Sequence, residues 1–328
     1  MAAISVIIPV YNGEKTIQET VQSVLNQTFS DIELIVINDG STDFTLDCLK
    51  QISDERLKIF SYPNAGLSAS RNRGIARSSG ELIAFIDADD LWTADKLRSQ
   101  WQVLQMNSDF TVAYSWTDYI NEYSQFLRRG GRLSVQGNAY PYLLLNNILE
   151  NGSSPLIRRH AFEEVGTFNE SLKAAEDWEM WIRLAARYAF ITVPQPQILY
   201  RVSSGSMSAN VVRQEVETLK VIQQSFAQAP DEYQFLKSAS LANFYKYLTF
   251  KALDGNPKRR NGLVASQFLA KFLINDPLML KQRVTFRTLL KIFTVTALPQ
   301  KQANQVLAKF GKIDNIGALM MNIQVEPF

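Results

Sequence analysis

The sequence predicts an α/β protein, in which a doubly wound, mostly parallel sheet is followed by a C-terminal helical extension. Two observations point to this class. Over the first hundred residues, short apolar runs rich in β-branched residues alternate with segments of helical period. From Ala209 onward the pattern is helical. Strands and helices that alternate at this spacing form right-handed crossovers between parallel strands. We therefore divide the chain into residues 1–208, which hold the sheet, and residues 209–328, a basic helical region.

Four apolar runs have the length and composition of strands buried on both faces of a sheet. They are Ile4–Val10, Glu33–Asp39, Leu57–Tyr62 and Leu82–Asp87. The helical segments between them are Lys15–Asn26, Thr42–Ile52 and Leu67–Arg77. Thr93 is the expected N-cap of a helix that reaches about Met106, and a strand follows over Thr111–Trp116. In the C-terminal region the expected helices are Val212–Ala227 and Tyr233–Leu253, with others beyond Pro257 and Pro277.

Composition excludes several classes of protein. With 328 residues, of which 46% are hydrophobic and 20% charged, the chain can bury a sizeable core and is not a disordered protein. No apolar run approaches the roughly 18 residues of a membrane span, and no basic segment precedes the first apolar run. The single cysteine, Cys48, excludes an intrachain disulfide and a cysteine-rich metal site. We therefore expect a cytoplasmic protein without a signal peptide.

The formal net charge of +2 conceals two oppositely charged parts. Residues 237–312 contain fourteen Lys or Arg and only two acids, Asp254 and Asp276. Because the whole chain has 34 basic and 32 acidic residues, the remainder has 20 basic and 30 acidic ones. A basic tail on an acidic body predicts that the tail meets something anionic. No recognised nucleic-acid-binding motif accompanies the charge, so we expect no nucleic-acid partner.

The stretch FIDADDLW places three carboxylates, Asp87, Asp89 and Asp90, directly after a predicted buried strand. Unpaired carboxylates repel one another and are costly to desolvate, so this cluster needs a cation, a basic partner or exposure to water. The carboxyl ends of parallel strands form the edge where open α/β sheets bind ligands. Pro9–Asn12 and Asn38–Gly40 follow two other strands of the predicted sheet. We expect the three polar clusters to converge on one crevice.

Two interpretations of these acids stay open on the residues alone. Mg²⁺ or Mn²⁺ takes one or two carboxylates and completes its shell with water and phosphate oxygens, which suits Asp87 and Asp89 beside a nucleotide diphosphate. In the other interpretation the acids belong to a solvated loop and cap the helix near Thr93, as Asp90 is placed to do. Asp39 is likewise either an acceptor of ligand hydrogen bonds or an Asx-turn residue.

A second acidic pair, Glu176 and Asp177, begins the amphipathic segment EDWEMWIRLA. Both residues fit the first turn of a helix, where acids interact well with the helix dipole. In the alternative, functional interpretation Asp177 is a general base. The helix N-terminus would keep its carboxylate ionised near neutral pH, ready to take a proton from an attacking hydroxyl.

Five stretches follow one another in a characteristic order. They are VIIPVYNGEKTIQETVQSVLNQT, LIVINDGSTD, NAGLSASRNRGIARSSGELIAFIDADDLW, GSSPLIRRHAFEEVGTFNESL and EDWEMWIRLA. Together they resemble family 2 glycosyltransferases of the GT-A fold, over about residues 3–208. The resemblance implies an inverting enzyme of the kind that builds cell-wall and other polysaccharides. It also implies a hexosyl- or N-acetylhexosaminyl-transferase, with UDP as the favoured nucleotide of the donor.

The resemblance assigns a donor site to residues 1–208. In that family a DXD-type motif binds the ribose and the metal on the diphosphate, which implies that Asp87 contacts the donor and that Asp89 binds Mn²⁺ or Mg²⁺. The first acidic motif contacts the base, which maps onto Asp39. The loop after the first strand packs around the same base, which implies donor contacts of Pro9 and Tyr11.

The resemblance also assigns the remaining site residues. Arg71 lies on a helix that faces the donor, and it is either a phosphate ligand or a structural residue. The acid pair before an aromatic supplies the base of inverting members, which implies that Asp177 is catalytic and that Glu176 holds the acceptor or its loop. Many relatives have a metal-ligating histidine after a Tyr-Arg pair, whereas Ser203 stands there in this chain. We therefore expect weaker metal affinity.

The function that follows from the resemblance is metal-assisted transfer of a sugar from a nucleotide-sugar donor to a hydroxyl of a glycan or lipid-linked acceptor. Two other classes stay open. A nucleotidyltransferase shares the doubly wound domain and the acids, but YNGEKT is not a glycine-rich basic phosphate loop. A non-catalytic nucleotide-sugar or glycan-binding protein would keep Asp39 and tolerate loss of Asp177.

The basic tail has two interpretations as well. Its Lys and Arg residues alternate with Leu, Phe and Ile at near-helical intervals. Such basic amphipathic helices lie on anionic membranes, which would place residues 237–312 at the inner membrane face near a lipid-linked acceptor. Alternatively these helices form a small bundle with a solvated basic exterior.

Overall fold

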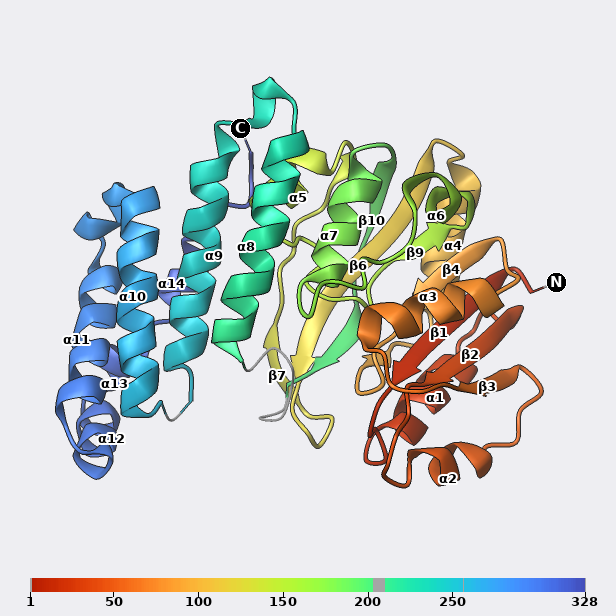
Figure 1. Ribbon diagram of the computed structural model, residues 1–328, viewed down its shortest axis with the longest axis horizontal. Coiled ribbons are helices and arrows are strands. Elements are labelled where there is room, and N and C mark those ends of the chain that lie inside the picture. Colours follow the sequence, from red (N-terminus) through yellow and green to blue (C-terminus); the bar gives the residue numbers. More distant parts are fainter. Residues whose placement is uncertain (1, 203–209, 256, 328) are drawn as a thin grey trace. The chain divides into compact units, whose positions relative to one another are not determined.

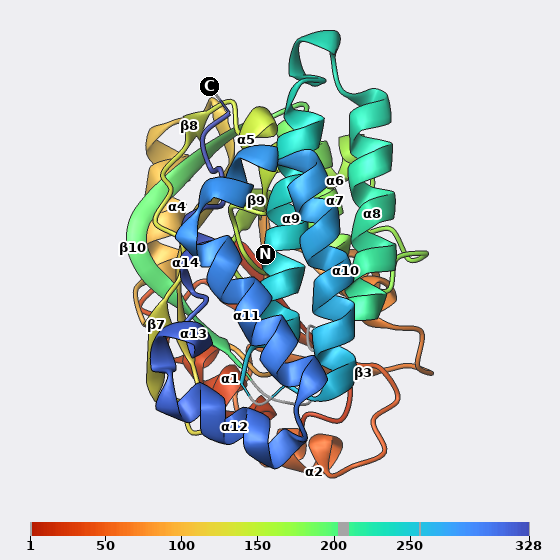
Figure 2. The same cartoon turned by 90° about the vertical axis from the view of Figure 1, so that its left-hand side faces the viewer.

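The computed structural model describes residues 2–202, 210–255 and 257–327 (Figures 1 and 2). Their contacts divide them into two compact units. Residues 2–143 and 147–202 form one, which we call the α/β unit. Residues 144–146 and 210–327 form the other, which we call the helical unit.

The α/β unit is built on one mixed sheet of ten strands with the order β3-β2-β1-β4-β9-β6-β10-β5, to which β7 and β8 are added beside β6 and β10. The strands are β1 (Ile4–Val10), β2 (Ile32–Asn38), β3 (Leu57–Ser61), β4 (Leu82–Phe85), β5 (Leu91–Trp92), β6 (Phe110–Ile120), β7 (Phe126–Arg129), β8 (Gln136–Gly137), β9 (Leu156–Arg158) and β10 (Ala189–Arg201). Strands β1 to β4, β6 and β10 run in one direction, and β9 runs opposite between β4 and β6. The predicted mostly parallel α/β sheet is confirmed.

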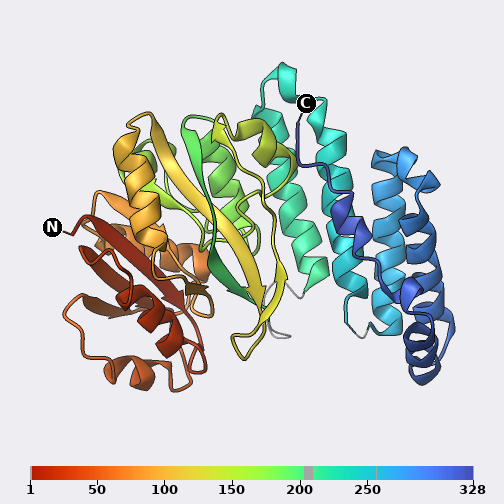
Figure 3. The same cartoon turned by 180° about the vertical axis from the view of Figure 1, so that it is seen from behind.

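Helices cover both faces of this sheet. They are α1 (Ile17–Leu25), α2 (Thr45–Lys50), α3 (Leu67–Arg77), α4 (Lys96–Met106), α5 (Tyr140–Leu145), α6 (His160–Val165) and α7 (Glu176–Ala185). Val6 and Ile8 point into a core shared with α1 and α4, whereas Ile7 points to the opposite face, toward α3. Figure 1 shows α3 and α7 in front of the sheet, and Figure 3 shows α4 on its other side. The alternation of side chains along β1 therefore produces the doubly wound arrangement.

The close approach of α3 to the sheet depends on a glycine. A Cβ atom on Gly74 would lie 2.3 Å from Cγ2 of Ile7, which is shorter than any real contact of two carbons. Glycine normally weakens a helix interior by about 1 kcal/mol relative to alanine. Here it allows the helix backbone to rest directly on β1, one turn away from Arg71.

Three expected helix starts are wrong, for local reasons. The helix expected from Thr42 begins only at Thr45, after a turn in which Asp43 Oδ1 accepts from the N–H of Thr45 at 3.0 Å. Thr93 does not cap α4, because its N–H donates to Gln197 O at 3.0 Å and so continues the pairing of β5 with β10. The helix begins at Lys96, with Asp95 before it. In the helical unit, the residues after Pro230 form a 3₁₀ turn, so the helix expected from Tyr233 begins only at Leu236.

The helical unit contains the remaining helices. They are α8 (Val211–Gln228), α9 (Leu236–Leu253), α10 (Arg259–Asn275), α11 (Arg283–Ala297), α12 (Gln300–Lys309), α13 (Gly311–Asp314) and α14 (Ala318–Met321), with 3₁₀ turns η2 (Asp231–Tyr233) and η3 (Pro277–Lys281). Buried polar residues of α9 tie the last described segment to this unit. Asn243 exchanges two hydrogen bonds with the backbone of Gln324, and Lys246 Nζ donates to Asn322 O at 2.9 Å. Among the described residues, no helix is both long and apolar enough to span a bilayer.

Candidate active site

The loops after β1 and β2 are tied to each other at the carboxyl edge of the sheet. The N–H of Asn12 donates to Ser41 Oγ at 2.9 Å, and its Oδ1 accepts from the N–H of Thr42 at 2.8 Å. The N–H of Gly13 donates to Thr45 Oγ1 at 2.8 Å. Asn12 has a φ of 53°, in the left-handed region that Asn adopts more readily than most residues. These bonds fix the two loops side by side.

The acidic turn after β4, residues 87–90, is tied to the same edge through α1. Thr16 Oγ1 and Thr20 Oγ1 donate to Ala88 O at 2.8 and 3.0 Å. Thr20 Oγ1 also lies 2.9 Å from Asp90 O. The three polar clusters therefore lie together at one edge of the sheet, and the crevice that they are expected to line stays a prediction.

Asp90 is a buried structural acid of this turn. Its side chain is inaccessible to solvent, its Oδ2 accepts from Ser153 Oγ at 2.6 Å, and its Oδ1 accepts from the N–H of Arg201 at 3.0 Å. Burial and the carboxylates of Asp89 and Asp87 raise its pKa well above the usual range. The interpretation of Asp90 as a solvated helix cap is wrong, because the residue faces inward and holds the turn to β10.

Arg71 joins the two acidic clusters that the sequence singled out. Its Nη2 donates to Asp87 Oδ1 at 2.7 Å, and its Nη1 donates to Glu176 Oε1 at 2.8 Å. Only 1% of the Arg71 side chain is exposed, and a Cβ on Gly152 would lie 2.3 Å from its Nη2. Burial lowers the pKa of Arg71, but the charges of Asp87 and Glu176 outweigh this effect and raise it. This guanidinium is thus a structural cation for the carboxylates, which is one of the two interpretations given to it above.

Asp177 lies beside Glu176 in the first turn of α7. Burial and the neighbouring Glu176 raise the pKa of Asp177 to about 7, although Arg71 and the hydrogen bond from the N–H of Trp178 oppose the shift. The expectation that the helix N-terminus keeps this carboxylate ionised near neutral pH is wrong, because lost hydration outweighs the helix dipole. A pKa near neutrality is the value that suits a general base.

Two backbone and side-chain features orient Asp177. The residue before the helix, Ala175, has a φ of 58°, a left-handed conformation that a residue with a Cβ rarely adopts. Glu176, the first residue of the helix, accepts from Arg71. On the other side, Nδ2 of Asn147 donates to Asp177 Oδ2 at 3.3 Å. The buried Oδ1 of Asn147 makes no hydrogen bond within the described part of the chain.

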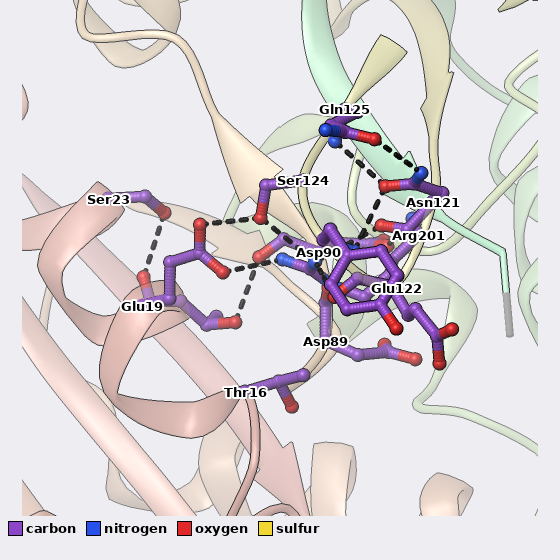
Figure 4. Close-up of polar contacts among 12 residues, drawn as sticks. Thr16, Glu19, Ser23, Asp89, Asp90, Asn121, Glu122, Ser124, Gln125 and Arg201 are labelled. Atoms are coloured by element: carbon purple, nitrogen blue, oxygen red, sulfur yellow. Dashed lines mark hydrogen bonds and ion pairs between the residues drawn. The ribbon is translucent and has the colours of Figure 1, made fainter. Parts of the chain in front are cut away.

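The side chain of Arg201, at the end of β10, holds the backbone of the acidic turn (Figure 4). Its Nε donates to Asp89 O at 2.7 Å, its Nη2 donates to Glu19 Oε2 at 2.7 Å, and its Nη1 donates to Ser124 Oγ at 2.9 Å. Ser124 Oγ in turn donates to Glu19 Oε1 at 2.7 Å. Arg201 is 3% exposed. One buried guanidinium therefore links the acidic turn, α1 and the loop between β6 and β7.

The donor atoms at the acidic turn fit a hard divalent cation. Burial and the charge of Asp87 raise the pKa of Asp89 to about 6, while Arg201 opposes the shift. A cation between the two carboxylates would relieve this repulsion. The described residues contain no group of three or more His, Cys, Asp or Glu arranged around a metal position, so water and phosphate oxygens would have to complete the shell. Ser203 lies outside the described residues.

Asp39 organises the loop before α3. Its Oδ1 accepts from the N–H of Ala65 at 2.9 Å and from Arg73 Nη1 at 3.0 Å, and its Oδ2 accepts from the N–H of Gly66 at 2.8 Å. Asp39 is 3% exposed. The Asx-turn interpretation is wrong for Asp39, because the side chain that accepts from the N–H of Ser41 belongs to Asn38, at 3.0 Å.

Pro9 and Tyr11 have different surroundings at the end of β1. Pro9 is buried within the strand and is paired with Ile37 of β2. Tyr11 follows the strand and is 54% exposed. Their contacts with a donor base stay a prediction, as do the donor contacts of Asp39.

Sequence reasoning missed residues that the fold brings into the site from far along the chain. Ser153 accepts from the N–H of Asp87 at 3.0 Å, and its carbonyl oxygen accepts from Trp92 Nε1 at 2.9 Å. Asn147 and Arg201 were missed as well. The signals were present: Ser153 lies in GSSPLIRRHAF, and Arg201 is the arginine of the Tyr-Arg pair. Nothing in the local pattern marked Asn147.

Comparisons with known proteins agree on one family. The model of the glycosyltransferase-like family 2 matches residues 5–252 of this chain. An uncharacterised glycosyltransferase of Rickettsia bellii is 34% identical over 187 residues, which cover 57% of this chain and 27% of the relative. Another, from Rickettsia conorii, is 26% identical over 83% of this chain and 46% of its own length. The chain thus spans between a quarter and a half of these relatives.

Solved structures share the fold at low sequence identity. Residues 1–349 of Staphylococcus aureus TarS, in complex with UDP-GlcNAc, superpose with a TM-score of 0.55 at 18% identity, covering 97% of this chain and 90% of that one. The mannosyltransferase PcManGT of Pyrobaculum calidifontis, in complex with GDP-Man and Mn²⁺, gives 0.59 at 16% identity, covering 98% and 88%. The protein has the GT-A fold, and by its family match it belongs to the glycosyltransferase-like family 2.

Proposed function

We propose that this chain is an inverting glycosyltransferase, which moves a sugar from a nucleotide-diphosphate donor to a hydroxyl of a glycan or lipid-linked acceptor. The observation that carries the proposal is Asp177, a partly buried acid whose pKa is about 7. It belongs to the same charged cluster as Asp87, through Arg71 and Glu176. A general base and a candidate diphosphate site are thus held together by one buried cation.

The reaction that this arrangement supports is a single displacement. Asp177 takes the proton of the acceptor hydroxyl, and the acceptor oxygen forms a bond to the anomeric carbon of the donor. The bond from that carbon to the diphosphate oxygen breaks on the opposite face, and its electron pair leaves with the nucleoside diphosphate. Attack opposite the leaving group inverts the configuration. Asn147 would hold the Asp177 carboxylate in place, and Glu176 would support the acceptor or its loop.

Asp87 and Asp89 would hold Mn²⁺ or Mg²⁺, with Asp89 as the main protein ligand. The ion would supply positive charge next to the leaving diphosphate. The raised pKa of Asp89, about 6, is the sign of an acid that gains from a nearby cation. Arg201 and Ser153 would keep the turn in place as the carboxylates change their charge.

Donor recognition would come from the loops at the carboxyl edge of the sheet. Tyr11 and Pro9 would pack around the base. Asp39 would accept a hydrogen bond from the base or from the sugar, in addition to those it accepts within the chain. Arg71, with Asp87, would lie below the diphosphate. UDP is proposed as the nucleotide because of the motif resemblance, and the sugar as a hexose or N-acetylhexosamine. The TarS and PcManGT structures contain UDP-GlcNAc and GDP-Man, respectively, so they do not favour one nucleotide.

The experiment that tests the proposal measures binding and slow hydrolysis of a panel of nucleotide sugars with Mn²⁺, for the intact protein and for Asp89→Asn and Asp177→Asn. We expect one donor to bind in a metal-dependent way. Asp177→Asn should keep this binding and lose turnover by about 10²- to 10⁴-fold, the usual contribution of a general base. Asp89→Asn should lose the metal dependence.

Other outcomes would replace the proposal with one of its rivals. Donor binding without any transfer or hydrolysis would favour a nucleotide-sugar-binding protein. Release of pyrophosphate from a nucleoside triphosphate and a sugar phosphate would favour a nucleotidyltransferase. We further propose that residues 1–208 form the catalytic domain, that residues 209–328 form an accessory domain, and that the protein acts in the cytoplasm.

A further inference from the structure

We propose that the outer face of α11 is a docking surface for an anionic lipid bilayer. The face consists of Phe286, Leu289 and Phe293, and these three side chains are 63%, 46% and 67% exposed. Their spacing of three and four residues places them along one side of the helix. An exposed apolar stripe of this kind is typical of a surface that binds another protein or a membrane.

The packing of α11 within its own unit does not explain this stripe. The opposite side of the helix is already buried, through Val284, Thr288, Ile292 and Val295. Figure 2 looks onto α11, which lies at the front of the helical unit with α10 beside it. The helix therefore has two apolar sides, of which only one faces the core of the unit.

More apolar surface adjoins the N-terminal end of α11. Leu278 and Leu280 of η3, the turn that leads into this helix, are 74% and 63% exposed. Ile274, near the end of α10, is 76% exposed. Solvated turns rarely carry so many large aliphatic side chains. With them, the apolar surface extends beyond one helix.

The charge around this surface selects the kind of partner. Residues 277–312 contain seven Lys or Arg and no acid. Lys281 and Arg283 are exposed beside the apolar residues, and Arg287 is half-buried. An apolar stripe flanked by cations is the pattern of helices that lie in the interface of anionic membranes. With no membrane-spanning helix among the described residues, the expected mode is peripheral.

The same charge argues against a second copy of this chain as the partner. A two-fold symmetric contact would place this surface against itself, so Arg283 and Arg287 of one copy would meet cations of the other with no acid from residues 277–312 to pair with them. A bilayer that contains phosphatidylglycerol offers both the acyl region for the phenylalanines and the phosphates for the arginines. We therefore favour lipid.

Vesicle flotation of the full chain tests this surface. The wild-type protein should float with vesicles of phosphatidylcholine and phosphatidylglycerol, and it should not float with phosphatidylcholine alone. The double variant Phe286→Ser/Phe293→Ser should partition about tenfold more weakly, because it loses most of the apolar surface of the stripe. The matched control is Phe44→Ser/Phe235→Ser, which removes two phenylalanines that are 71% and 60% exposed elsewhere. This control should float like wild type.

A charge variant and a mass measurement complete the test. Arg283→Gln/Arg287→Gln should weaken flotation and reduce its sensitivity to salt. All variants should keep the wild-type melting temperature, because the altered side chains are mostly outside the core. Equal flotation of both phenylalanine double variants would overturn the proposal, as would no flotation of the wild type. A fall in oligomeric mass of Phe286→Ser/Phe293→Ser without vesicles would instead identify a protein interface. None of these readouts needs a sugar donor, so the inference stands or falls apart from the proposed transferase activity.

Discussion

Nη1 of Arg71 donates to Oε1 of Glu176 at 2.8 Å, which connects α3 to the start of α7 across 105 residues of sequence. The other side of the same guanidinium binds Asp87. A single buried cation thus sets the distance between the candidate base region and the acidic turn. Several measurable consequences depend on this cation and on its neighbours.

Replacing Arg71 should damage both stability and donor binding. Arg71→Ala leaves the buried Glu176 and the partly buried Asp87 without their cation. Removing one partner of a buried ion pair typically costs about 3–5 kcal/mol. Arg71→Lys keeps the charge but cannot hold both acids with a planar fork, so an intermediate loss is expected. Thermal unfolding and donor titration measure the two effects. Arg77→Lys, on the same helix but at its exposed end, is the matched control. An unchanged melting temperature of Arg71→Ala would show that the acids do not need this partner.

The raised pKa of Asp177 predicts a pH dependence of stability. A carboxyl with a pKa of about 7 in the folded chain and about 4 in the unfolded one binds its proton more tightly when folded. Stability is therefore lost as the pH rises from about 4 to about 7. Asp177→Asn should be more stable than wild type at pH 8, on the order of 2 kcal/mol, and no more stable below pH 4. Chemical denaturation at both pH values measures this difference. A variant that is less stable at pH 8 contradicts the assignment.

Ionisation of Asp177 should raise the activity with pH, whereas it lowers the stability. Because the base must be deprotonated, kcat/KM should rise with pH through about 7 at fixed metal concentration. Asn147→Asp would place a third carboxylate beside Asp177, which should shift this ascending limb to higher pH by roughly one unit. Asn107→Asp, on the surface after α4, is the control and should leave the profile in place. The readout is the pH profile itself, since a merely structural effect would lower the rate at every pH.

The contacts of Arg201 should affect the affinity for Mn²⁺ more than the rate of sugar transfer. Arg201→Lys keeps a positive charge, but it cannot donate to Asp89 O, Glu19 and Ser124 at the same time. The acidic turn should loosen, and the Mn²⁺ concentration for half-maximal donor binding should rise about tenfold, while kcat at saturating Mn²⁺ falls much less. Glu19→Gln should give a smaller effect in the same direction. Glu55→Gln, an exposed acid of the same unit, is the control. If Arg201→Lys lowers kcat and leaves the metal dependence unchanged, Arg201 does not act through metal binding.

The sheet was predictable because its signals are local. The runs around Ile7, Val36 and Ala84 are short, apolar and bounded by turn residues, and each forms the expected strand. Their order along the chain, with helices between them, then requires the polar loops to share one edge. The position of Asp87 beside that edge follows from the same rule.

What the sequence did not show are the contacts that fold the chain back on itself. Arg201 and Glu19 are 182 residues apart, and Ser153 reaches Asp90 across 63 residues. No periodicity encodes such pairs. The ionisation of Asp177 was mispredicted for a related reason: the helix N-terminus can be read from the sequence, whereas the burial that overrides it depends on residues packed from distant segments.

Because Gly74 has no Cβ atom, α3 can lie close to β1, and this spacing fixes the position of Arg71 and its carboxylate partners. Any side chain at this position would lift α3 away from Ile7, and Arg71, one turn earlier, would move with it. Random mutagenesis would therefore score Gly74 as intolerant, even though it contributes no functional group and lies on the side of α3 that packs against β1. A redesign of donor preference should therefore change the loops at the carboxyl edge of the sheet and keep glycine at position 74, so that the distance between α3 and β1 stays the same.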